Sequence, residues 1–131
     1  MISTKGRYAL RVMLDLAQNN GGNYVPLKDI AERQEISKKY LEIIVKEMVV
    51  GGLIKGASGK GGGYKLVRKP SEYSVGEILE LMEGTLSPVA CLADKSFDCN
   101  RRKTCETLPM WKEFDEIVHN YFYNKKLTDL L

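Results

Sequence analysis

Hydrophobic residues in the first fifty positions recur at the spacing expected of α-helices. Apolar side chains at i, i+3, i+4 and i+7 line one face of a helix, and three stretches follow this pattern. Ser3 or Thr4 can cap the first helix, Pro26 can open the second, and Ser37 can cap the third. The three apolar stripes are Ala9, Leu10, Met13, Leu14, Leu16 and Ala17; Leu27, Ile30 and Ala31; and Leu41, Ile44, Val45 and Met48.

The second and third predicted helices are joined by a tight turn. Ala31 is small enough for the helices to cross closely, and Ile36 places an apolar side chain in the turn. This matches a helix-turn-helix, whose second helix enters the DNA groove. The outward face of that helix combines hydroxyls, cations and a carboxylate, which can hold phosphates and read base edges. The candidate DNA contacts on it are Ser37, Lys38, Lys39, Tyr40, Glu42 and Lys46.

A glycine-rich segment follows, flanked by two short stretches that predict the strands of a β-hairpin, 53–55 and 64–67. A Gly-Lys pair in it invites a nucleotide-binding interpretation. That interpretation fails because Gly61 follows Lys60 where Ser or Thr is needed, and because a strand follows where a helix is required. A cationic hairpin directly after a recognition helix is instead typical of the wing of a winged helix. Its lysines, placed for contact with the DNA backbone or minor groove, are Lys55, Lys60 and Lys65.

Two further helices are predicted after the hairpin. Ser74 and Glu77 form a capping-box signature for the first, which ends at Gly84. Pro109 opens the second, a long helix with a broad apolar stripe. The stripe consists of Met110, Trp111, Phe114, Ile117, Val118, Tyr121 and Phe122. Such a stripe could cover the protein's own core, but it is also what a dimer interface requires, and we favour a homodimer.

These elements predict a mainly α fold, a winged helix-turn-helix with a two-stranded wing and a long C-terminal dimerisation helix. The 131 residues suit one domain with an appended segment. We expect a DNA-binding domain at 1–70, a linking helix and cysteine loop at 71–108, and the dimerisation helix with the C-terminal tail at 109–131.

Charge is distributed unevenly along the chain. Residues 1–70 hold 13 Lys or Arg against 6 Asp or Glu, whereas residues 71–131 hold 7 against 11. A basic first half predicts contact with a polyanion, here double-stranded DNA. No apolar run approaches membrane-spanning length, so we expect a soluble protein that does not contact a membrane.

All three cysteines, Cys91, Cys99 and Cys105, fall within fifteen residues. The residues between them are polar and show no hydrophobic period, so this segment is predicted to be an exposed loop. An odd number excludes a closed set of intrachain disulfides, and nothing at the N-terminus resembles a secretion signal, which predicts a reducing, cytoplasmic location. Thiolates converging on a metal or an iron-sulfur cluster would order such a loop, although chance clustering of inert cysteines is the alternative.

No catalytic pair, substrate pocket or cofactor motif accompanies the thiols, so we expect neither an enzyme nor a small-molecule substrate. Two other hypotheses stay open at this stage. One is a regulator of the same fold that senses oxidants or nitric oxide through metal-free cysteines. The other is a small redox enzyme or electron carrier that uses the cluster, which the lack of a catalytic pair and of a cofactor motif disfavours.

Four motifs together carry a resemblance to a known family: Ser3 to Leu10, Ile36 to Glu42, Gly59 to Tyr64, and the cysteine triad followed by Trp111. Over nearly its whole length the chain resembles the Rrf family of bacterial winged-helix transcription regulators, and in particular its iron-sulfur members. The resemblance implies a homodimeric transcription factor, usually a repressor, whose operator binding depends on an iron-sulfur cluster. It implies control of genes for cluster assembly or iron homeostasis.

The resemblance also implies roles for individual residues. Cys91, Cys99 and Cys105 would be the ligands of a cluster, with two irons favoured over four. Ser37, Tyr40 and Glu42 would contact the operator, and the glutamate would help to discriminate between operator classes.

Two positions depart from the family pattern. Leu108 stands where relatives carry a histidine as the fourth ligand, and Ser58 stands where they carry a wing arginine, which leaves Lys60 as the nearby cation. His119 is the only histidine, and along a helix it would lie roughly 21 Å from the third cysteine. The local oxygen donors are Asp94, Asp98 and Glu106.

Overall fold

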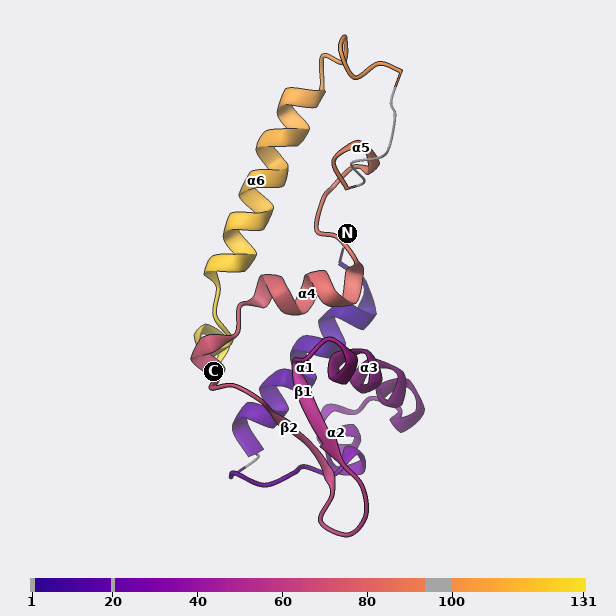
Figure 1. The fold of residues 1–131 in the computed structure, drawn as a ribbon, viewed down its shortest axis with the longest axis vertical. Coiled ribbons are helices and arrows are strands. Elements are labelled where there is room, and N and C mark those ends of the chain that lie inside the picture. The colour runs from indigo at the N-terminus through magenta and orange to yellow at the C-terminus, as the bar shows by residue number, and fades with distance from the viewer. Residues whose placement is uncertain (1, 20, 94–99) are drawn as a thin grey trace.

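The computed structural model describes residues 2–19, 21–93 and 100–131 and forms a winged helix with a helical extension (Figure 1). The elements are α1 (Thr4–Asn19), α2 (Leu27–Gln34), α3 (Lys38–Val50), β1 (Ile54–Ala57), β2 (Gly63–Leu66), the 3-10 helix η1 (Pro70–Glu72), α4 (Val75–Glu83), α5 (Ala90–Ala93), α6 (Leu108–Asn124) and the 3-10 helix η2 (Leu127–Leu130). The mainly α fold with a two-stranded antiparallel wing is confirmed.

Local capping signals begin three of the helices as predicted. The Ser3 hydroxyl accepts from Gly6 N (3.3 Å), and the Ser37 hydroxyl accepts from Tyr40 N (3.1 Å). Ser74 and Glu77 form the complete capping box at the start of α4. Each cap satisfies a backbone N–H that has no partner within its own helix, which fixes where the helix starts.

Two sequence predictions need correction near the cysteines. The segment around Cys91 was predicted to be loop, but it forms the single turn of α5, in which Leu92 N and Ala93 N donate to Val89 O. A helix of four residues is too short to show a 3.6-residue hydrophobic period, so the sequence pattern could not predict α5. The last helix begins at Leu108, one residue before the predicted start, with Pro109 inside its first turn.

One hydrophobic core joins α1, the helix-turn-helix, the hairpin and α4. Its buried side chains come from all these elements and include Met13, Leu16, Ile30, Leu41, Ile44, Met48, Ile54 and Ile78. A second, smaller cluster joins α4 to α6 and contains Val75, Leu79, Leu86 and Val118. The long helix α6 is therefore attached to the body mainly through α4, and its N-terminal end extends away from the body (Figure 1).

A buried carboxylate connects α1 to the helix-turn-helix. Asp15 is fully buried, and Arg33 donates to its two oxygens at 3.0 and 2.7 Å. Gln34 donates a third hydrogen bond to Asp15 at 2.9 Å. These bonds fix the end of α2, directly before Glu35 adopts a left-handed conformation with φ 55°. A buried charge needs such pairing to be stable. The hydrogen bonds to Asp15 therefore fix the turn between α2 and α3 to α1.

The hairpin is anchored to the segment before α2. Val25 N donates to Tyr64 O (2.8 Å), and Tyr64 N donates to Val25 O (2.9 Å). This close approach requires glycine at position 63, where φ is 142° and a Cβ would come within 2.2 Å of Val25 O. Within the described ranges, no helix has the length and apolar character needed to cross a bilayer.

Candidate nucleic-acid interface and cysteine site

Helix α3 separates its two faces as the sequence predicts. Leu41, Ile44, Val45 and Met48 are buried against α1 and α2, whereas Ser37, Lys38, Lys39, Glu42 and Lys46 are exposed. The exposed side presents three ammonium groups, one carboxylate and one hydroxyl along a single helix. This is a surface suited to DNA, and the contact of each residue with DNA stays a prediction.

Tyr40, the sixth predicted contact on this face, is only half exposed. Its ring packs edge to face on Tyr8, with centroids 5.7 Å apart, and the Arg11 guanidinium lies 5.2 Å from the centre of the Tyr8 ring. Arg11 also donates to the backbone carbonyl of Gln34. Tyr40 is therefore held by a fixed stack of side chains from α1, a constraint that the sequence did not reveal.

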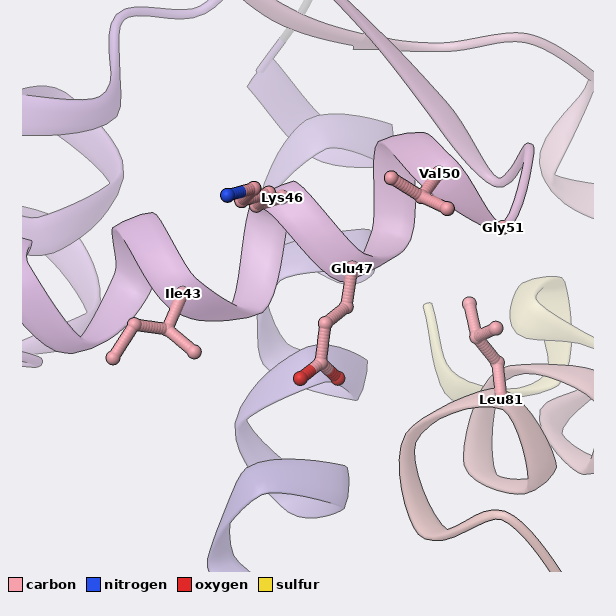
Figure 2. A pocket seen from close by; sticks show the side chains of 6 residues that line it. All are labelled: Ile43, Lys46, Glu47, Val50, Gly51 and Leu81. Atoms are coloured by element: carbon pink, nitrogen blue, oxygen red, sulfur yellow. The ribbon is translucent and has the colours of Figure 1, made fainter.

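The C-terminal half of α3 faces α4 across an open groove of about 580 Å³ (Figure 2). The groove is lined by Ile43, Lys46, Glu47, Val50, Gly51 and Leu81. Glu47 forms an ion pair with Lys5 of α1 at 3.1 Å, and the Lys46 ammonium projects from the helix in a different direction. Glu47 therefore neutralises Lys5 of α1 and not the neighbouring Lys46.

The wing concentrates positive charge. Lys55 and Lys65 lie directly opposite each other in the register of the two strands, and Ser58 and Lys60 are exposed at the tip. Like charges at paired positions destabilise a hairpin unless a counter-charge is near. The Lys65 ammonium lies 4.6 Å from the ring centre of Tyr24, a cation–π contact that offsets part of this cost. Such a hairpin is adapted to a polyanion.

At the base of the wing, one buried hydroxyl joins the segments that lead into and out of the hairpin. Tyr73, fully buried, donates to Leu53 O (2.7 Å) and accepts from Val67 N (3.0 Å) and Arg68 N (3.1 Å). Arg68 lies over the Tyr73 ring at 4.2 Å and pairs with Glu77 of α4 at 2.6 Å. No sequence motif marked Tyr73, because its partners are brought near only by the folded hairpin.

The structure brings two of the three cysteines together. Cys91 of α5 and Cys105, which precedes α6, line one small hollow with Arg102 and Leu108. Both thiols are half-buried and free of disulfides, and Arg102 donates to Cys91 O at 2.8 Å. Cys99 lies outside the described residues. The hollow is located at the N-terminal end of α6.

The surroundings of Cys105 favour its thiolate. A hydrogen bond with the Thr107 hydroxyl (3.3 Å between Sγ and Oγ1) lowers the pKa of the Cys105 thiol, assisted by the backbone N–H groups of Thr107 and Leu108 and by the Arg101 charge. Thiolate is the form that binds metals. The donor chemistry of Cys91 and Cys105 therefore fits an iron-sulfur centre.

The other predicted donors are placed differently. Glu106 is exposed beside Cys105, and Asp94 and Asp98 fall outside the described ranges. His119 Nδ1 lies 2.9 Å from the Asp115 carbonyl and 3.3 Å from its carboxylate, while the ring stacks on Tyr123. His119 Nδ1 is therefore engaged within α6. Among residues 2–19, 21–93 and 100–131, no three Cys, His, Asp or Glu side chains converge as a metal centre.

The apolar stripe of α6 divides into two faces. Val118 is buried against α4, and Trp111 and Phe122 are partly buried. The second face is open, with exposed fractions of 53% for Met110, 40% for Phe114, 56% for Ile117 and 58% for Tyr121. Four large apolar side chains in one exposed row are typical of an interaction surface.

The fold and these surfaces define the chain as a winged-helix DNA-binding regulator. Residues 2–131 match the Rrf2 family, described as iron-dependent transcriptional regulators, so the chain belongs to the Rrf2 family. Its relatives are named as transcriptional regulators, which makes a role in regulation, and not in catalysis, the family-level conclusion.

Individual relatives resemble the chain over almost all its length. The HTH-type transcriptional regulator IscR of Klebsiella pneumoniae (strain 342) is 34% identical over 130 residues, which cover 99% of this chain and 78% of that protein. Among solved structures, CymR, the global cysteine regulator of B. subtilis, has a TM-score of 0.80 and 34% identity, covering 99% of this chain and 95% of CymR. IscR of T. potens has a TM-score of 0.75 and 35% identity, covering 99% and 85%.

Proposed function

We propose that this protein is a homodimeric transcription regulator, acting as a repressor, whose binding to operator DNA depends on an iron-sulfur cluster. The observation that carries the proposal is the hollow in which Cys91 and Cys105 meet at the start of α6. Similarity to regulators named IscR and the iron-dependent description of the family support it. The genes controlled would be those of cluster assembly or iron homeostasis.

Cys91, Cys99 and Cys105 would hold the cluster, which we expect to contain two irons. A bound cluster would supply a covalent cross-link between α5 and the start of α6. Leu108 lines the hollow but has no donor atom, so the fourth ligand would be an oxygen such as that of Glu106, or an exchangeable group. A weak fourth ligand would let the cluster be lost readily, which suits a sensor.

The path from the cysteines to DNA runs through α6. Fixing the N-terminal end of α6 would fix its open apolar face, where the partner subunit packs, and α6 is attached to the DNA-binding body through α4. The dimer then sets the separation of the two recognition helices. Half-sites lie about 34–36 Å apart, so a small change in dimer geometry alters operator affinity.

Substitutions on the recognition helix should separate two kinds of DNA contact. Lys39→Ala and Lys46→Ala should each weaken binding to all duplexes and lower the salt slope of the affinity by about one, because each removes a phosphate contact. Glu42→Ala should instead change which bases are preferred, since a carboxylate accepts from cytosine N4. Titrations over a salt series, against duplexes selected from a random library, measure both effects.

Lys112→Ala is the matched control, because Lys112 is an exposed lysine of α6, away from the helix-turn-helix. It should leave affinity and salt slope unchanged. If Lys39→Ala and Lys46→Ala behaved like this control, α3 would not be the DNA-binding helix.

A further inference from the structure

The base of the wing differs from an ordinary hairpin end. The ladder pairs Ile54 with Leu66, and the next pair outward would be Leu53 with Val67. The Tyr73 hydroxyl lies there instead, bonded to Leu53 O on one side and to Val67 N and Arg68 N on the other. A single side-chain oxygen therefore joins the two chain segments at which the wing enters and leaves the body.

Tyr73 is itself fixed independently of that hydroxyl. Its ring is fully buried in the main core, and its backbone carbonyl accepts from Leu127 N of η2 at 3.0 Å. Arg68 covers the ring and is held by Glu77. The hydroxyl thus connects a rigid part of the body to the root of the wing.

The wing is held to the body at two places, the Tyr73 hydroxyl at its root and the Val25–Tyr64 backbone pair nearer its tip. Strands rise about 3.3 Å per residue, so Lys60 at the tip lies on the order of 15–20 Å from Tyr73. The Val25–Tyr64 pair lies about 10 Å from the root and acts as the pivot, so a displacement of the root by about 3 Å would turn the wing and move its tip by a comparable distance. The wing projects from the body at the opposite end from the start of α6 (Figure 1).

We propose that Tyr73 is a positioning residue for DNA binding: its buried hydroxyl, acting together with the Val25–Tyr64 pair, sets the direction of the wing and so places Lys60 on the DNA backbone. Without the hydroxyl, Leu53 O, Val67 N and Arg68 N lose their shared partner. Buried backbone groups do not stay unpaired, so the two segments separate to reach water and the wing turns. This inference rests on the proposed DNA-binding function.

A double-mutant cycle tests it with the full-length chain. Operator affinity and its salt slope are measured for the unaltered protein, Tyr73→Phe, Lys60→Ala and the double variant, with all four in the same cluster state. Tyr73→Phe should lower affinity by about three- to tenfold and reduce the salt slope by about one. In the Lys60→Ala background, Tyr73→Phe should cause little further loss, because the contact that it places is already missing.

Ile78→Val is the control for stability. It trims a fully buried residue of the same core without touching the wing root, and should lower the melting temperature while leaving DNA affinity unchanged. Additive losses in the cycle, or unchanged affinity in either single variant, would overturn the inference. Failure of the unaltered protein to bind any selected duplex would instead refute the proposed function itself.

Discussion

Replacing Cys91, Cys99 and Cys105 together with alanine should change operator affinity by more than tenfold, which corresponds to at least about 1.4 kcal/mol. The expected cause is the loss of the cross-link between α5 and the start of α6. Without the proposed cluster, the first turn of α6 would lose its link to Cys91, which shares a hollow with Cys105. The dimer then samples several separations of its recognition helices, and operator half-sites tolerate few of them.

The measurement is a binding titration of the triple variant against selected operators, beside the unaltered protein purified without oxygen. Asn100→Ala combined with Thr104→Ala is the control, since both residues lie in the same exposed segment and all three thiols are kept. This control should bind like the unaltered protein. If the triple variant bound every operator with the same affinity as the unaltered protein, the cysteines would not control DNA binding.

Ile117→Asp should convert the protein to a monomer and lower operator affinity by at least about a hundredfold. Ile117 is 56% exposed in the middle of the open face of α6, so the substitution adds a charge without disturbing the protein's own core. In a dimer the same carboxylate would be buried without a partner, which costs several kcal/mol. A monomer can contact only one half-site and loses the affinity that comes from binding two.

Sedimentation at micromolar concentration measures this effect directly, and the titration with operator follows it. Lys112→Glu is the matched control, because it changes charge by twice as much on the other side of the same helix. It should remain a dimer. If the unaltered protein were already a monomer at micromolar concentration, the interface assigned to α6 would be wrong.

Local signals in the sequence predict most of the fold. Ser37, Ser74 and Glu77 act within their own helix turns, so their caps could be identified from neighbouring residues alone. The period of apolar residues predicts which side of α3 is buried, because burial follows helix geometry. The winged helix as a class follows from the order of these elements.

Features that depend on distant residues could not be predicted in this way. Asp15 meets Arg33, and Tyr73 meets Leu53, only after the chain has folded, and neither pair has a sequence spacing that marks it. The sequence predicts a single apolar stripe on α6, because the covered face and the open face are adjacent on the helix. Only the packing of α4 shows which side is covered and leaves Ile117 open.

The cysteine site could be predicted only in part from the sequence. Clustering of the three thiols predicts ligation from chemistry, and the structure adds that Cys91 and Cys105 share a hollow with Leu108. Their roles as ligands stay a prediction. So do the contacts of Ser37, Lys38, Lys39, Tyr40, Glu42, Lys46, Ser58 and Lys60 with DNA.

Dependence of DNA binding on the cluster is tested most simply by measuring operator affinity for a single anaerobic preparation before and after the cluster is removed with a chelator. We expect visible absorbance and bound iron in that preparation, and a change in affinity of more than tenfold when both are lost. The triple cysteine variant should contain no iron and bind operator like the stripped protein. Operator affinity that stays unchanged when the absorbance and iron are lost would contradict cluster-dependent binding.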